Sequence, residues 1–134
     1  SHEVEMIRQA RALDLLTAPY VFNPAEAEAM AEAGADVIVA HVGTTLSGMI
    51  GALTTMTLDE AAEAVQLMHD AAKKVNPDVL VLCHGGPIAV PEDVSYVLAR
   101  TQGVDGFFGA SSMERLPVEI AIAETTMRFK AVKM

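Results

Sequence analysis

The sequence predicts an α/β fold: a parallel (βα)4 half of a TIM (βα)8 barrel, preceded by one extra N-terminal helix. Nearly continuous apolar runs alternate with amphipathic segments, which is typical of right-handed βαβ crossovers. Polar, glycine-rich segments follow the apolar runs, whereas the turns after helices are short, as in barrels that work at the carboxyl ends of their strands. An open doubly wound sheet is the alternative, although no glycine-rich dinucleotide fingerprint follows the first strand.

The first part of the chain is expected to hold two helices and two strands. Apolar positions at helical spacing predict the first helix, and an asparagine cap followed by proline opens the second, which a glycine ends. Pro19 is unfavourable inside the first strand because it removes a ladder donor. The expected elements are a helix over 3–15, a strand over 16–22, a helix from Asn23 and Pro24 to Gly34, and a strand over 36–42.

The second part is expected to hold a long loop, three helices and two strands. Thr57 and Glu60 have capping-box spacing before one helix, and Ser111 and Glu114 have it before the last, with Pro117 in its first turn. The expected elements are a loop over 43–57, a helix over 58–75, a strand over 78–83, a helix over 91–101, a strand over 104–109 and a helix over 117–130.

Four strands cannot close a barrel, which typically needs about 250 residues. The chain has 134 residues. A half-barrel leaves apolar, unpaired edge strands at 16–22 and 104–109, and such edges are templates for association. We therefore expect a homo-oligomer through these edges, or pairing with a missing first half.

Composition limits the partners. A net charge of −9 and a pI near 4.7 argue against nucleic acid and anionic membranes. The apolar stretches are too short to cross a bilayer, and no signal peptide is recognisable. Cys83 is the one cysteine, so we expect an inert core thiol and a cytoplasmic protein. Ser1 and His2 have the composition of a cloning remnant, and the domain is expected to span 3–134.

Several strings together resemble one known family. The most specific are His-Gly-Gly-Pro-Ile at 84–88 and Gly-Ala-Ser-Ser-Met-Glu-Arg-Leu-Pro at 109–117, supported by segments at 3–8, 15–22, 33–36 and 41–45. The chain resembles the C-terminal half of the phosphoenolpyruvate hydrolase-like TIM-barrel domain, which also forms the C-terminal part of a plant virus-resistance protein. Family members look roughly twice as long, so the first four strand–helix units are expected to be absent.

The resemblance implies a function for the intact parent. The family name implies a hydrolase that acts on an enol phosphate or related phosphonate, so the parent is expected to bind or act on a small phosphorylated or carboxylated metabolite. The chain alone is expected to be inactive, because half of the active-site rim is missing. The alternative is a non-catalytic regulatory barrel that binds a ligand or a protein.

An anion site is expected where the resemblance places the loops after the seventh and eighth strands of the barrel. Gly85 and Gly86 would let backbone N–H groups approach an anion, Ser111 and Ser112 would add hydroxyl donors, and Arg115 a bidentate donor. The alternative is structural: the glycines form a turn, the serines cap a helix, and Arg115 pairs with Glu114 or Glu119.

His41 and His84 end successive strands, where catalytic side chains project in this fold. Each is a candidate general acid or base, and each could instead be a structural hydrogen-bonding residue. No carboxylate ends a strand, since Asp36, Asp78 and Asp105 lie at strand beginnings. We therefore predict no metal site in this half, and a divalent metal only with ligands from the missing half.

Other polar positions have weaker assignments. Tyr20 could donate to a ligand or simply pack its ring. A possible ligand loop comprises Gly43, Thr44, Thr45, Ser47 and Gly48. His69 is expected to be a solvated polar position. Strand alternation turns Cys83 and His84 to opposite faces, which argues against a cysteine–histidine nucleophilic pair.

Overall fold

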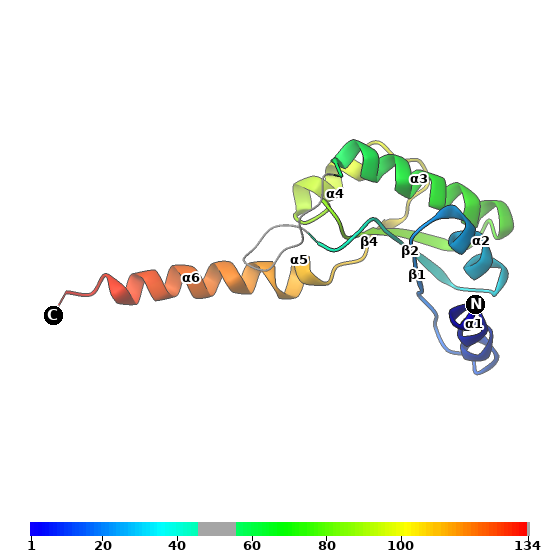
Figure 1. The fold of residues 1–134 in the computed structure, drawn as a ribbon, viewed down its shortest axis with the longest axis horizontal. Coiled ribbons are helices and arrows are strands. Elements are labelled where there is room, and N and C mark those ends of the chain that lie inside the picture. The colour runs from blue at the N-terminus through cyan, green and yellow to red at the C-terminus, as the bar shows by residue number, and fades with distance from the viewer. Residues whose placement is uncertain (46–55, 134) are drawn as a thin grey trace.

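The chain folds into one parallel sheet with helices on one of its faces. The structure is a computed structural model and describes residues 1–45 and 56–133. The sheet has four strands in the order β1-β2-β3-β4, and α2, α3 and α4 lie over the same face (Figure 1). The strands are β1 (Tyr20–Val21), β2 (Val37–His41), β3 (Leu80–His84) and β4 (Gly106–Phe107). The arrangement is the half TIM barrel that the sequence predicts.

Six helices connect and extend these strands in the described residues. They are α1 (His2–Ala12), α2 (Pro24–Glu32), α3 (Leu58–Val75), α4 (Pro91–Leu98), α5 (Ser111–Glu114) and α6 (Leu116–Lys130). None of these helices combines the length and hydropathy needed to cross a membrane. Ser1 and His2 take part in the first helix, because Ser1 Oγ accepts a hydrogen bond from Val4 N–H at 3.4 Å and His2 begins α1.

The core lies between the central strands and the helix layer. β2 and β3 pair in register along their whole length, from Val37 opposite Leu80 to His41 opposite His84. Alternate residues of both strands are fully buried with the apolar faces of α2 and α3, among them Ile38, Ala40, Val81 and Cys83. The other side chains of these strands face the opposite side of the sheet, which is the inner side of a barrel.

The predicted starts of α2 and α3 are confirmed. The Asn23 side chain accepts from Glu26 N–H at 2.9 Å, and Pro24 takes the first helical position. Thr57 and Glu60 form a reciprocal capping box, in which Glu60 N–H donates to Thr57 Oγ1 and Thr57 N–H donates to the Glu60 carboxylate. These local bonds satisfy donors that a helix start leaves unpaired, which is why sequence spacing alone identifies them.

The two edge strands are confirmed in place but are shorter than predicted. β1 covers two of the residues expected over 16–22, and β4 covers two of those expected over 104–109. Pro19 has no N–H to donate, although its carbonyl still accepts from Val39 N–H at 3.0 Å. Single bonds of this kind extend the pairing beyond the strands proper, since Phe108 N–H also donates to Cys83 O at 2.9 Å.

Two helices end earlier than predicted. α1 ends at Ala12 rather than at residue 15, because Asp14 takes a left-handed conformation with φ of 58°. α4 ends at Leu98 rather than at residue 101, and Gly103, with φ of 77°, turns the chain toward β4.

The capping box predicted at Ser111 is wrong. Ser111 is the first helical residue of α5, Ala110 precedes it as the cap, and no side chain bonds this cap. Glu114 therefore ends the four-residue helix instead of closing a cap around its start. A separate helix, α6, begins at Leu116 and has Pro117 in its first turn, as expected.

The solvated position predicted for His69 is also wrong. His69 is buried on the face of α3 that carries Val65 and Ala72. Its Nδ1 lies 2.8 Å from Asp70 Oδ1, while its Nε2 has no hydrogen-bond partner among the described residues. The helical spacing from Val65 places residue 69 on the buried face, so the burial of His69 could have been predicted from the sequence pattern.

Carboxylates at the strand beginnings join neighbouring units of the fold. Asp36, just before β2, accepts from both Thr17 N–H at 2.9 Å and Thr17 Oγ1 at 2.8 Å, and these bonds lower the pKa of Asp36. Asp105, just before β4, accepts from Val81 N–H at 2.8 Å. Each bond joins the start of one strand to the neighbouring segment of the sheet. These bonds lie at the amino-terminal ends of the strands, whereas His41 and His84 lie at the carboxyl-terminal ends.

The hydrogen bonds of Asp36 predict that loss of this carboxylate destabilises the fold more than loss of Asp78 does. Asp36→Ala is expected to lower the free energy of unfolding by ~1–3 kcal/mol, because a backbone N–H and a hydroxyl lose a charged acceptor. Chemical unfolding monitored by circular dichroism measures the change. Asp78→Ala is the matched control, since Asp78 is exposed at the beginning of the next strand; equal losses in the two variants would contradict this role of Asp36.

Candidate functional site at the strand ends

His41 and His84 lie side by side at the carboxyl ends of β2 and β3. The residues are directly opposite in the parallel register, and their ring centroids are 4.7 Å apart at an interplanar angle of 74°. His84 is buried and His41 is half-buried. The structure thus brings together the two histidines that the sequence singles out, on the inner side of the sheet.

The hydrogen bonds of the two rings indicate different tautomers. His84 Nδ1 is 2.7 Å from Phe108 O, and a carbonyl only accepts, so Nδ1 carries a proton and Nε2 of the neutral ring has a free lone pair. His41 Nδ1 is 3.1 Å from Gly43 N, whose N–H can only donate, so Nδ1 is unprotonated and Nε2 carries the proton. The pair therefore offers one acceptor and one donor.

Burial favours the neutral form of His41. Desolvation lowers the pKa of His41 below its ordinary value of 6.5, and the nearby His84 lowers the pKa further. A neutral His41 retains its bond from Gly43 N–H, which an imidazolium would lose. The site thus offers an acceptor at His84 Nε2 and a hydrogen-bond donor at His41 Nε2–H.

Aromatic rings surround the histidines. Tyr20 stacks on His84 with centroids 4.9 Å apart and an interplanar angle of 11°, and it meets His41 edge-on at the same distance. Phe108 packs edge-on against His84 at 5.7 Å, and Phe22 packs against His41 at 4.8 Å. Sequence reasoning missed Phe22 and Phe108 as site residues. The β3–β4 register could have found Phe108, since Cys83 pairs with Phe107 and His84 is next in line.

Gly43, Gly85 and Gly86 join the loops that follow β2 and β3. Gly86 N–H donates to Gly43 O at 2.6 Å, and both Gly85 and Gly86 have positive φ, of 80° and 57°. A Cβ on Gly85 would collide with the Gly43 carbonyl oxygen. Close approach of two backbones is therefore one role of these glycines, and the Gly86 N–H is engaged within the chain.

The loop residues proposed as ligand contacts are only partly described. Thr44 is exposed and Thr45 is buried, directly after Gly43. Ser47 and Gly48, the other members of the predicted ligand loop, lie outside the described residues.

Ser111, Ser112 and Arg115 follow the carboxyl-terminal end of β4, on the same side of the sheet's strand ends as the histidines. They are not part of the group of aromatic rings around His41 and His84. Ser111 begins α5 three residues after Phe108, whose carbonyl holds His84. Arg115 Nη1 lies 3.1 Å from Glu119 Oε1, and the two side chains are only 17% and 16% exposed. The alternative pairing of Arg115 with Glu119 is present, in a mostly buried rather than a surface setting.

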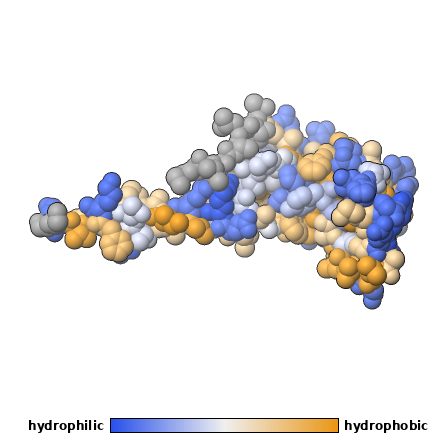
Figure 2. Space-filling model, turned by 60° about the horizontal axis from the view of Figure 1, so that its bottom comes forward, coloured by the Kyte–Doolittle hydropathy of each residue, from blue (hydrophilic) through white to orange (hydrophobic). Residues whose placement is uncertain are grey.

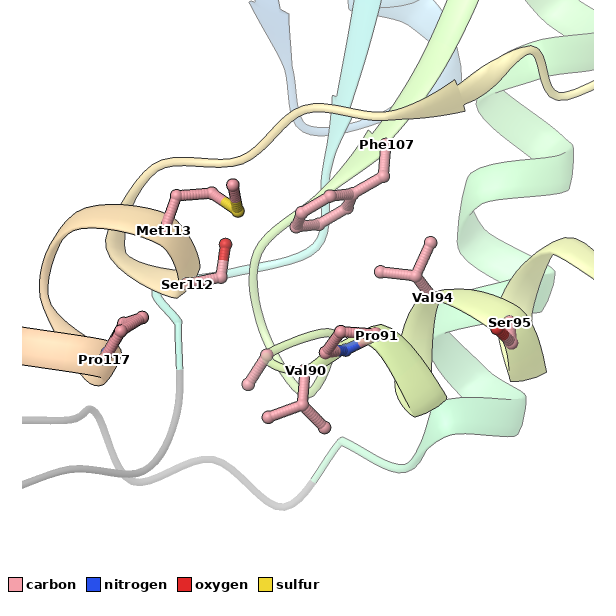
Figure 3. Close-up of a pocket in the computed structure, with 9 residues that line it drawn as sticks. Val90, Pro91, Val94, Ser95, Phe107, Ser112, Met113 and Pro117 are labelled. Carbon is pink, nitrogen blue, oxygen red and sulfur yellow. The ribbon is translucent and has the colours of Figure 1, made fainter. Parts of the chain in front are cut away.

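A separate apolar pocket lies on the helix-covered side of β4 (Figure 3). It has a volume of about 530 Å³ and lies between the start of α4, β4 and α5. Val90 and Val94 come from the α4 side, Phe107 from β4, and Ser112 and Met113 from α5 (Figure 3). Ser112 thus lines this pocket, which the site predictions did not anticipate.

Metal-ligating side chains do not cluster in the part of the chain that the structure describes. Within residues 1–45 and 56–133, no three histidine, cysteine, aspartate or glutamate side chains lie close enough to hold an ion. The carboxylates of Asp36 and Asp105 lie at the far edge of the sheet, where they bind Thr17 and Val81.

Comparison with known proteins identifies the family. Residues 1–132 match the family described as phosphoenolpyruvate hydrolase-like. The chain belongs to this family. It is 60% identical to the ToMV susceptible protein tm-1(GCR26) and 59% identical to the ToMV resistance protein Tm-1(GCR237), both from Solanum lycopersicum. Each match covers 98% of the chain but 18% of the tomato protein.

A solved structure supports the half-barrel character of this family member. The nitroalkane oxidase from Streptomyces ansochromogenes, a TIM-barrel-like enzyme, is similar with a TM-score of 0.52 and 26% identity. The similarity covers 82% of this chain and 31% of the oxidase chain. The phosphoenolpyruvate hydrolase-like chain thus corresponds to one portion of a larger barrel.

The lowered pKa of His41 predicts a pH-dependent stability. The unfolded chain binds a proton at His41 more readily than the folded chain, so the free energy of unfolding should fall as pH drops from about 7.5 to about 5.5. His41→Gln should reduce this decline, whereas His2→Gln, at an exposed position, should not. Urea unfolding at the two pH values tests this prediction. An unchanged difference in the free energy of unfolding between the two pH values in His41→Gln would contradict it.

Burial raises the pKa of the Cys83 thiol to about 11. The folded protein should therefore resist a thiol reagent such as 5,5′-dithiobis(2-nitrobenzoate) near neutral pH, and urea-unfolded protein should react fully. Absorbance of the released chromophore measures the reaction. Rapid labelling of the folded chain would show that Cys83 is accessible.

Proposed function

We propose that this chain supplies one half of the ligand-binding rim of a phosphoenolpyruvate hydrolase-like barrel, whose parent binds or acts on a small phosphorylated or carboxylated metabolite. The observation that carries this proposal is the His41–His84 pair, with one ring offering a lone pair and its neighbour a proton. Enol phosphates and carboxylates need both kinds of group when a proton moves and negative charge develops on oxygen.

The two histidines take different roles in this proposal. His84 Nε2 is the general base that removes a proton from substrate or water, and Phe108 O orients its ring through Nδ1–H. His41 Nε2–H donates to the oxygen on which negative charge develops, and Gly43 N–H holds it in the donating tautomer. Tyr20 packs against both rings and restricts their movement, so it acts as a positioning residue.

We place the proposed anion site between the loop that follows β3 and the start of α5. Ser111 and Ser112 occupy the first two positions of α5, where backbone N–H groups have no acceptor within the helix. Arg115 adds a positive charge beside these N–H groups, next to its contact with Glu119. Gly85 contributes through its open conformation, while Gly86 N–H holds the loop to Gly43.

Self-association through the sheet edges completes this proposal. β1 and β4 are the edge strands of the sheet, and the exposed Leu16 and Phe22 flank β1. A second copy, or the first half of the parent barrel, would cover these residues and close the ring around the histidines. The complete rim, and hence turnover, then requires groups from outside this chain.

A second candidate function is a regulatory barrel that binds without turnover. The names of the two tomato relatives, which refer to ToMV susceptibility and resistance, favour it. In that case the His41–His84 pair would bind a ligand or protein group by the same donor and acceptor and would need no reacting bond.

Binding of phosphoenolpyruvate tests the anion site. Its addition should shift the amide resonances of Ser111 and Ser112 in NMR spectra, and Arg115→Gln should weaken binding about tenfold because a charged donor is lost. Arg100→Gln is the control, since Arg100 lies over the Tyr96 ring in α4. Absence of shifts at α5, or equal weakening in both variants, would contradict the anion site.

Release of phosphate from phosphoenolpyruvate tests the dependence on the missing half. The purified chain is expected to show no turnover above the uncatalysed rate, because displacement of catalytic groups by about 1 Å already costs about a hundredfold. Turnover by the chain alone that disappears in His84→Ala would overturn the proposed inactivity while supporting the role of His84.

A further inference from the structure

The histidine pair is surrounded by aromatic side chains in a chain that has few of them. The sequence holds two tyrosines, four phenylalanines and no tryptophan. Three of these six rings, those of Tyr20, Phe22 and Phe108, have centroids 4.8 to 5.7 Å from an imidazole of the pair. We call these three side chains the ring wall. Half of the aromatic side chains of the protein thus gather around His41 and His84.

The ring wall differs from other exposed apolar surface by what it borders. Apolar side chains are also exposed along α6, the arm that leaves the body of the molecule (Figure 2). The ring wall instead lies beside two hydrogen-bonding groups, the Nε2 atoms of His41 and His84. Among the described residues, the buried side-chain nitrogen without a partner is His69 Nε2, so the two Nε2 atoms of the site are open to a ligand.

A ligand that binds these Nε2 atoms comes within reach of the ring wall. A hydrogen bond to an imidazole nitrogen spans about 3 Å, so the ligand oxygen lies close to the imidazole plane. Tyr20 stacks on His84 at 11°, and Phe22 lies against His41 at 41°. Tyr20 and Phe22 are 40% and 60% exposed, so both retain ring surface for contact. The atoms attached to the bound oxygen therefore lie next to aromatic carbon.

The surroundings of the ring wall favour an uncharged group. Among the described residues, ion pairs and cation–π contacts involve other side chains, such as Arg115 with Glu119 and Arg100 over Tyr96. Burial lowers the pKa of His41, as expected where water is partly excluded and a charge costs free energy. A negative group of the ligand is therefore better placed at the proposed anion site beside α5 than between the rings.

We propose that the ring wall selects ligands whose carbonyl or enol oxygen lies between an anionic head and a planar, uncharged, unsaturated group such as an aryl or alkenyl substituent. This inference rests on the proposed function, because it takes His41 and His84 as the groups that bind the oxygen. The planar group packs against Tyr20 and Phe22, through the offset-stacked and edge-to-face contacts that aromatic rings favour. Tyr20 and Phe22 then determine specificity by touching the ligand, and the preferred ligand is larger than phosphoenolpyruvate.

Phenylpyruvate and pyruvate are the probes that test the ring wall. These two 2-oxo acids share a carboxylate and a carbonyl and differ by one phenyl ring. In NMR titrations of the chain, phenylpyruvate should bind about tenfold or more tightly than pyruvate, because its ring leaves water for contact with Tyr20 and Phe22. The ring resonances of Phe22 should shift with phenylpyruvate and stay in place with pyruvate.

Phe22→Ala is the variant that tests the selection. It should remove most of the preference for phenylpyruvate and leave the affinity for pyruvate unchanged, because the phenyl ring loses its most exposed partner. The backbone N–H of Phe22, which donates to Glu26 Oε2 at 2.8 Å, is kept in this variant, so the start of α2 is preserved. Phe129→Ala is the matched control, since it removes a ring that is 75% exposed on α6, and it should keep the preference.

The outcomes separate this inference from the proposed function. Equal affinity for the two acids, or no binding of phenylpyruvate up to about 10 mM, would overturn the selection by the ring wall. Equal weakening of both acids in Phe22→Ala would also overturn it, because Phe22 would then only position His41. Phosphoenolpyruvate, which has no ring, still tests the anion site in each of these cases. Arg115→Gln should weaken both acids alike and keep their ratio, so failure of the anion site is seen separately.

Discussion

The in-register pairing of β2 with β3 is the constraint on which the site depends. Two parallel strands of equal length, paired from Val37–Leu80 to His41–His84, must end at the same level. Both histidines are last in their strands, so the sheet itself sets the 4.7 Å between their rings. A slip of one residue would turn one imidazole into the core and an aliphatic side chain onto the site. The apolar residues Ile38 and Cys83, buried against the helices, prevent that slip.

The backbone that follows the two strands gives the two aligned histidines different hydrogen-bonding roles. The backbone after β2 bends so that Gly43 N–H reaches the ring of His41, and the Gly43 carbonyl in turn accepts from Gly86. His84 bonds instead through Nδ1 to Phe108 O, just after the next strand. Two identical side chains thereby acquire opposite hydrogen-bonding roles, which the strand register alone would not produce.

The sequence predicts the repeat pattern of the fold better than its details. Apolar runs located all four strands, and capping residues located the starts of α2 and α3, because both signals are local. The single-turn α5 escaped prediction because its Ser-x-x-Glu string falls inside the helix, one residue later than a cap requires. The sequence also did not specify the direction of α6, because a helical pattern does not say which surface the helix will pack against.

The sequence likewise predicts which residues form the candidate site but not their hydrogen bonds. His41 and His84 stood out because polar residues at the ends of apolar strands are unusual, and their proximity followed from parallel pairing. Their tautomers depend on single backbone atoms of Gly43 and Phe108, which no residue pattern specifies. The burial of His69 was available from helical spacing, but a polar residue beside Asp70 looked solvated.

The simple strand order has a consequence for synthesis. Because the sheet runs β1-β2-β3-β4, each new strand pairs with the one just before it in the chain. No segment must wait for a distant one to be made, so the cost of loop closure stays small at each step. A ribosome that releases the chain from its N-terminus can therefore deliver finished units in succession, each providing the template on which the next assembles.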